Sequence, residues 1–146
     1  MFPYITSLFG NPHSQTYPTG LLPAKAVERA RKQISDAIHA KPSDIIFTSG
    51  ATESNNMAIK GLVMTNPTRK HIVTTKIEHK IVLVCCEELE KQGYDITYLD
   101  VESNGLINIE KLKSVLREDT LLCSFIFVNN EVGVAQPLKE IGELCR

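Results

Sequence analysis

Apolar positions along the chain alternate between helical and strand-like spacing. Four apolar residues near the start share one face of a helix that we expect to begin near Pro23 and end before Lys41. They are Val27, Ala30, Ile34 and Ile38. Residues 1–19 hold Pro and Gly at a density typical of loops, and we expect them to be irregular.

Short apolar runs predict four strands, and amphipathic stretches between them predict helices. The predicted strands cover residues 45–48, 71–74, 95–99 and 121–128. The last run, LLCSFIFV, is almost wholly apolar, as expected of a strand buried on both faces of a parallel sheet. The predicted helices cover residues 52–63, 80–92 and 109–116, with a last helix from residue 137.

This order, one helix followed by four strand–helix pairs, predicts an α/β fold. We expect an open, mainly parallel sheet with flanking helices and right-handed crossovers. No composition shift or repeat marks a domain boundary, so residues 1–146 are predicted to belong to one domain.

Polar residues follow three of the predicted strands, where ligands bind in such sheets. They are the clusters Ser49–Thr52, Thr74–His79 and Asn129–Glu131. In the first, a strand turns through Gly50 into a helix, which leaves backbone N–H groups free for an anion such as a phosphate. The alternative is that Ser49 or Thr52 simply caps this helix.

Composition excludes several classes of function. The net charge is −1, with 42% hydrophobic and 23% charged residues, which is typical of a globular domain and argues against binding to nucleic acid or an anionic membrane. We expect neither a membrane span nor a targeting segment, because no long apolar run and no signal pattern is present.

The four cysteines predict no metal site. Cys85, Cys86, Cys123 and Cys145 form no C-x-x-C pair, so a zinc site is not expected. Cys85 and Cys86 lie in a predicted helix and Cys123 in a predicted strand, where buried thiols are expected, and a reducing compartment fits best.

Four motifs in this order resemble the cysteine desulfurases of the IscS/NifS type, and they span almost the whole chain. They are GNPHS (residues 10–14), TSGATESNN (48–56), EHK (78–80) and VNNEVG (128–133). The resemblance implies a class V aminotransferase family member of the aspartate-aminotransferase fold with pyridoxal 5′-phosphate as cofactor. It implies that Ala51 and Thr52 hold the phosphate, that His79 is catalytic and stacks on the cofactor ring, and that Asn130 contacts the phenolic oxygen.

The resemblance also implies the reaction and the partners. L-cysteine would give L-alanine and an enzyme persulfide, and the sulfur would pass to an iron–sulfur scaffold or another acceptor protein. The resemblance further implies a homodimer that is located in the cytoplasm or the mitochondrial matrix.

Several residues that this chemistry requires have no match in the chain. The family's Schiff-base lysine, its pyridinium-binding aspartate and its mobile-loop cysteine are not found, so we expect an N-terminal fragment of the cofactor domain, cut short at both ends and inactive alone. One alternative is another pyridoxal-phosphate enzyme, such as a selenocysteine lyase or an aminotransferase. A second alternative is a non-catalytic remnant that binds phosphate or a partner. A third, a nucleotide-binding domain, is disfavoured because the glycine motifs of such domains are missing.

Overall fold

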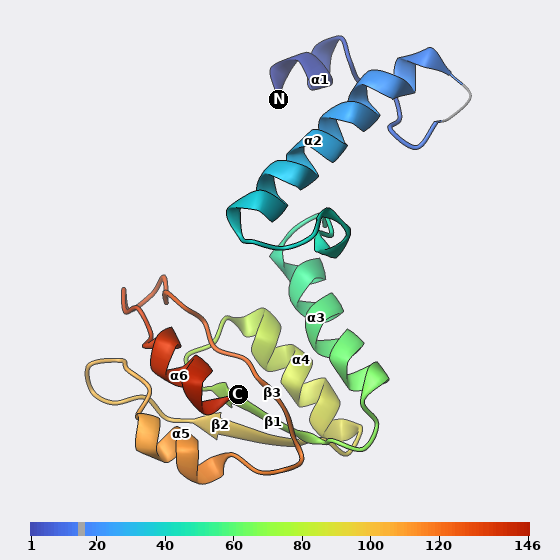
Figure 1. Ribbon diagram of the computed structural model, residues 1–146. Helices are drawn as coiled ribbons and strands as arrows, with labels where there is room; N and C mark the ends of the chain where they lie inside the picture. Colours follow the sequence, from blue (N-terminus) through green and yellow to red (C-terminus); the bar gives the residue numbers. More distant parts are fainter. Residues whose placement is uncertain (15–16) are drawn as a thin grey trace. The chain divides into compact units, whose positions relative to one another are not determined.

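The computed structural model describes residues 1–14 and 17–146, and the chain divides into two compact units (Figure 1). We refer to Met1–Phe47 as the N-terminal unit and to Thr48–Arg146 as the C-terminal unit, and each is described by itself. Among the described residues, no helix has the length and apolarity needed to cross a membrane. That residues 1–146 form one part of a larger domain stays a prediction.

Helices account for most of the N-terminal unit. It contains α1 (Phe2–Thr6), the 3₁₀ turn η1 (Pro18–Gly20), α2 (Leu21–Ala37) and the 3₁₀ turn η2 (Pro42–Asp44). The prediction of α2 is confirmed, although the helix begins two residues before Pro23. The prediction of an irregular segment over residues 1–19 is wrong at α1, where a proline lies in the first turn and costs no hydrogen bond.

Two glycines allow the chain to cross itself closely in the N-terminal unit. A Cβ atom on Gly10 would lie 2.1 Å from the carbonyl oxygen of Thr19, and one on Gly20 would lie 2.5 Å from that of Asn11. No side chain fits at either position without moving the backbone. The GNPHS motif is therefore part of a tightly packed backbone crossing.

The predicted strand at residues 45–48 is wrong. The chain is extended at Ile45 (φ −91°, ψ 122°), but in the described part of the chain no strand pairs with this segment. A strand is stable only when a neighbouring backbone satisfies its polar groups. Here a side chain takes that role, because the Arg31 guanidinium donates to the Ile45 carbonyl and lies 4.9 Å from the centre of the Phe47 ring.

A parallel three-stranded sheet lies at the centre of the C-terminal unit. Its strands are β1 (His71–Thr75), β2 (Asp95–Leu99) and β3 (Thr120–Cys123), in the order β2-β1-β3. The β1–β2 register runs from His71 opposite Asp95 to Thr75 opposite Leu99. The class predicted for the fold, an open parallel sheet with flanking helices, is confirmed, with three strands in place of four.

Helices cover both faces of this sheet (Figure 1). They are α3 (Ala51–Thr65), α4 (Lys80–Lys91), α5 (Ile109–Val115) and α6 (Leu138–Leu144). Ile72 and Val73, neighbours on β1, point to opposite faces and enter two separate apolar clusters. The first cluster lies under α3 and α4, and the second lies under α5 and α6. This explains why every residue of β1 is buried.

Strand β3 is shorter than the apolar run predicted. Only Thr120–Cys123 pairs as a strand, and its residues are half-buried rather than buried on both faces. Ser124 stays attached to β1, because its backbone nitrogen donates to the Val73 carbonyl at 2.9 Å and its carbonyl accepts from the Thr74 hydroxyl at 2.9 Å. Further on, Val128 and Ala135 form an isolated antiparallel bridge that closes the turn at residues 129–134.

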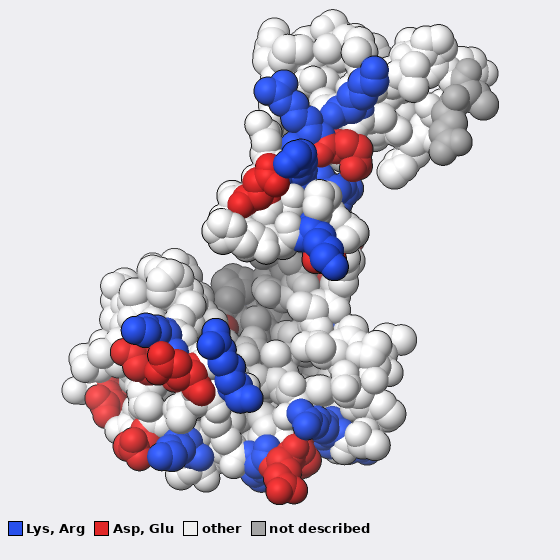
Figure 2. Space-filling model, viewed as in Figure 1, with Lys and Arg blue, Asp and Glu red and all other residues white. Residues whose placement is uncertain are grey.

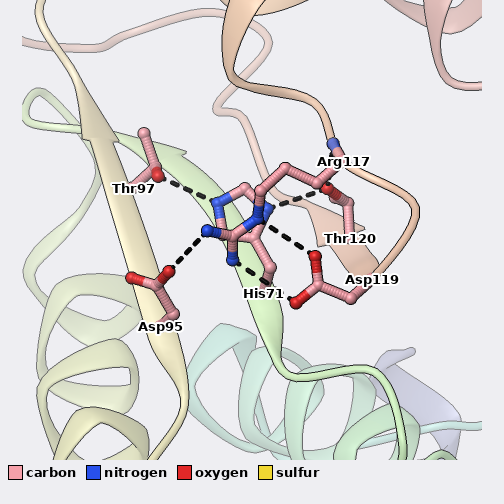
Figure 3. Close-up of polar contacts among 6 residues, drawn as sticks. All are labelled: His71, Asp95, Thr97, Arg117, Asp119 and Thr120. Carbon is pink, nitrogen blue, oxygen red and sulfur yellow. Dashed lines mark hydrogen bonds and ion pairs between the residues drawn. The ribbon is translucent and has the colours of Figure 1, made fainter.

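A polar node lies at the amino end of the sheet (Figure 3). The ring of His71 is fully buried, and its two nitrogens lie 2.8 Å from Thr120 Oγ1 and 2.9 Å from Thr97 Oγ1. Beside it, Arg117 bridges Asp95 at 2.7 Å and Asp119 at 3.0 Å. Burial first, and then the charge of Arg117, lower the pKa of His71, so that the ring stays neutral.

Charges elsewhere on the C-terminal unit are mixed. On the face shown in Figure 2, Lys and Arg side chains lie beside Asp and Glu side chains. Lys76 and Lys111, for example, lie 2.7 Å and 3.8 Å from the carboxylate of Asp100. Such exposed pairs are screened by water and contribute little to stability, so they balance the surface charge rather than hold the fold.

We predict that acid destabilises the protein through His71. Below about pH 6.5 the unfolded chain binds a proton at this residue, whereas the folded chain, with its lowered pKa, binds it only at a lower pH. Stability should therefore fall as the pH drops from 6.5, with a limiting slope of about 1.4 kcal/mol per pH unit. Urea unfolding of the protein and of His71→Asn between pH 5 and 8 measures the difference in slope.

A matched variant, His39→Asn, removes an exposed histidine and controls for the general effect of replacing histidine by asparagine. Equal pH slopes for the protein and for His71→Asn would contradict the prediction.

Candidate functional site

The start of α3 is held by a carboxylate that folds back onto the preceding turn. Glu53 Oε2 accepts hydrogen bonds from the backbone nitrogen and the hydroxyl of Ser49, both at 2.7 Å. The backbone hydrogen bond from Ser49, followed by that from its hydroxyl, lowers the pKa of Glu53. The turn is further closed by Thr48 Oγ1, which lies 2.6 Å from Ser54 Oγ.

This arrangement leaves the first N–H groups of α3 open. Gly50 is the N-cap residue, and no side chain caps the helix, so the alternative role of Ser49 or Thr52 as its cap is wrong. Ser54 is the first residue whose N–H bonds within the helix, to the Gly50 carbonyl at 3.1 Å. Within the described residues no group accepts from the N–H groups of Ala51, Thr52 or Glu53. Open donors at a helix N-terminus suit an anion.

His79 is the N-cap residue of α4. Its Nδ1 atom accepts a hydrogen bond from the Ile81 backbone nitrogen at 3.2 Å. A neutral ring that accepts at Nδ1 carries its proton on Nε2. The other ring nitrogen is thereby left available to donate or to exchange a proton outside the helix.

Thr52 and His79 line one cavity of about 320 Å³ between α3 and α4. The α3 side chains are those of Thr52, Asn56 and Lys60, which recur at helical spacing on one stripe. The remaining lining residues come from α4 and its cap: His79, Lys80, Ile81, Val84, Cys85 and Glu88. Two lysines against one glutamate make this lining net positive, which also favours an anion.

Asn130 is not among the residues that line this cavity. It lies exposed in the turn after β3, whereas its neighbour Asn129 is 4% exposed. Asn129 Nδ2 donates to the Ile77 carbonyl at 2.7 Å, and its Oδ1 atom accepts from the nitrogens of Glu131 and Val132 at 2.8 and 3.0 Å. Sequence reasoning selected Asn130 and missed the structural role of Asn129.

Glu78 is a second buried polar residue that sequence reasoning gave no role. Its carboxylate accepts from the Ile126 backbone nitrogen and lies 3.4 Å from Thr75 Oγ1. Burial raises the pKa of Glu78, partly offset by these hydrogen bonds. The signal in the sequence was weak, because an acidic residue after a strand is normally exposed to solvent.

Three cysteines in this unit, Cys85, Cys86 and Cys123, are not activated. Burial raises the pKa of Cys85, which lines the cavity, and raises the pKa of Cys86 to about 12. Burial first, followed by the neighbouring Cys145, raises the pKa of Cys123 to about 12. A thiol with so high a pKa is protonated at neutral pH and is a poor nucleophile.

Comparisons with known proteins agree on one family. The family model described as Aminotransferase class-V matches residues 1–146. The mitochondrial cysteine desulfurase of Candida maltosa is 55% identical over all of this chain and 30% of its own length. Cysteine desulfurase IscS of Neisseria gonorrhoeae is 52% identical over all of this chain and 36% of its own length. The chain thus spans about a third of the curated relatives it matches.

A solved structure described as a NifS-like protein has a similar fold. It superposes on 98% of this chain with a TM-score of 0.91 and 36% sequence identity, and the match covers 39% of that protein. The resemblance to IscS/NifS-type proteins expected from the four motifs is confirmed.

We predict that thiol reagents discriminate among the four cysteines of the folded protein. Cys145 is exposed, whereas Cys85 and Cys86 are buried and Cys123 is half-buried. At pH 8 a maleimide should label Cys145 at least about tenfold faster than Cys86, because reaction requires an accessible thiolate. Peptide mass spectrometry over a time course measures each rate, and denaturant should equalise them. Rapid labelling of Cys86 before unfolding would refute the prediction.

Proposed function

Since the chain belongs to the aminotransferase class V family, we propose that the cavity between α3 and α4 is part of a pyridoxal 5′-phosphate site. The observation that carries the proposal is that Thr52 and His79 line one cavity, while the first N–H groups of α3, the helix that carries Thr52, are open. Thr52 lies in the first turn of α3, and His79 is the N-cap residue of α4.

The residues present fit the cofactor's chemical groups. A phosphate needs several hydrogen-bond donors and a positive potential, and the N–H groups of Ala51 and Thr52, the Thr52 hydroxyl and the helix dipole would supply them. An aromatic heterocycle needs a flat partner, which the His79 imidazole offers. Asn130 would contact the phenolic oxygen, from the turn that Asn129 holds.

Each residue then has a separate task. Ala51 and Thr52 bind and orient the phosphate, while the ring of His79 fixes the plane of the cofactor. With Nδ1 engaged by Ile81, His79 can hold or release a proton at Nε2 only. The cofactor, when bound, supplies an electron sink for carbanions at the substrate's α-carbon, and the protein supplies binding and orientation.

We infer that the whole protein acts as a cysteine desulfurase, like the relatives it matches. The substrate would be L-cysteine and the products L-alanine and an enzyme persulfide, whose sulfur passes to an iron–sulfur scaffold or another acceptor. The protein would work as a homodimer in the cytoplasm or in the mitochondrial matrix. The identities of 52–55% to named desulfurases support this activity over those of other class V enzymes.

We predict that Thr52→Val weakens binding of pyridoxal 5′-phosphate by about tenfold to a hundredfold. Valine keeps the shape of the side chain but removes a hydroxyl that would donate to a charged phosphate, an interaction that contributes about 1.5–3 kcal/mol. Isothermal titration of the purified protein with pyridoxal 5′-phosphate measures the dissociation constant directly.

The matched control is Thr65→Val at the other end of α3, where the hydroxyl bonds with the Gly61 and Leu62 carbonyls and with Asn66 Nδ2. It should leave the dissociation constant unchanged. Equal affinity of Thr52→Val and the unsubstituted protein, or no binding by either, would overturn the proposed site.

A further inference from the structure

The carboxyl end of β1 and the loop after it are joined to the segment that follows β3 by hydrogen bonds at three successive levels. Nearest the sheet, Thr74 Oγ1 donates to the Ser124 carbonyl at 2.9 Å. Next, the Ile126 backbone nitrogen donates to the Glu78 carboxylate. Farthest out, Asn129 Nδ2 donates to the Ile77 carbonyl at 2.7 Å. The two loops lie about fifty residues apart in sequence and are held side by side by these bonds.

All three side chains in these bonds are buried. Thr74 is fully buried, Asn129 is 4% exposed and Glu78 is 8% exposed. A buried polar group that loses its partner is strongly destabilised, so each bond favours one relative position of the two segments.

Asn129 is the residue that connects both loops to the candidate site. Its amide nitrogen holds the Ile77 carbonyl, two residues before His79, and its amide oxygen holds the nitrogens of Glu131 and Val132. Its backbone also closes the turn, since Asn129 N donates to the Val134 carbonyl at 2.9 Å and Gly133 N donates to the Asn129 carbonyl at 2.8 Å. One side chain therefore sets both the approach to His79 and the turn that carries Asn130.

We propose that Asn129 is a positioning residue that fixes the His79 ring at the cavity by tying the two loops together. This inference rests on the proposed function for the statement that His79 meets the cofactor. Asn129 itself reaches no reacting group; it acts through Ile77 and through the cap that His79 forms on α4. The links of Thr74 and Glu78 hold the same two loops nearer the sheet.

The test is Asn129→Asp, because aspartate keeps the two acceptor bonds of the turn and removes the donor to Ile77. The matched control is Asn104→Asp, where an exposed asparagine accepts from Leu106 N at 3.0 Å in another turn. Nitrogen-15 spectra of the His79 ring, assigned by comparison with His79→Gln, report its tautomer. The exchange rate of the Ile81 amide reports the cap.

In Asn129→Asp we expect the His79 ring signals to move from a single tautomer toward a mixture, and Ile81 exchange to quicken about tenfold. Asn104→Asp should leave both unchanged. A folded Asn129→Asp with an unaltered His79 spectrum and unaltered Ile81 exchange would overturn the inference. If Asn129→Asp does not fold, the second variant is Thr74→Val, which removes the bond to the Ser124 carbonyl. We expect the Ile81 amide to exchange about threefold faster in Thr74→Val, and an unchanged exchange rate would overturn the inference.

Titration with pyridoxal 5′-phosphate separates this inference from the proposed function. If the His79 spectrum changes as expected and Asn129→Asp binds the cofactor about tenfold more weakly, both stand. If the spectrum changes but the unsubstituted protein binds no cofactor, the positioning role stands and the proposed function fails.

Discussion

Burial of β1 is the constraint on which the rest of the C-terminal unit depends. Each residue from His71 to Thr75 is enclosed, with a parallel strand on either side and helices over both faces. A strand in this position can satisfy its backbone only through its two neighbours, and its side chains must suit two separate cores. Each buried polar side chain of β1 named here has its own hydrogen-bond partner: His71 bonds to two threonines, and Thr74 bonds to the Ser124 carbonyl.

The two ends of β1 serve different purposes. At the amino end, the buried ring of His71 and the Arg117 bridge join all three strands through Thr97, Asp95 and Thr120 (Figure 3). At the carboxyl end, the chain turns through Glu78 into the His79 cap of α4. The amino end stabilises the sheet, whereas the carboxyl end carries the polar groups from which a site can be built, as is usual for open parallel sheets.

Sequence patterns predicted local structure well where one short segment decides it. Examples are the strand at 95–99 and the helices that begin after residues 50, 79 and 108. These elements depend on periodicity and capping, which can be recognised within a short stretch of sequence. The prediction of a strand at 45–48 was wrong because a strand needs a neighbouring strand to pair with. Here the Arg31 side chain donates to the Ile45 carbonyl instead. The prediction at 121–128 was only partly right, because pairing with β1, a distant segment, extends only to Cys123 and to the backbone nitrogen of Ser124.

The sequence alone determined the fold class, the family resemblance and the candidate residues Ala51, Thr52 and His79, because these rest on motifs of adjacent residues. Only the tertiary structure decided that Thr52 and His79 share a cavity, that Glu78 is buried, and that Asn129 rather than Asn130 holds the turn. The physical reason is that packing of α3 against α4, and hydrogen bonds between the segments that follow β1 and β3, bring together residues that are far apart in the sequence. The free energy of a polar group in such a place depends on its partner, which no local pattern records.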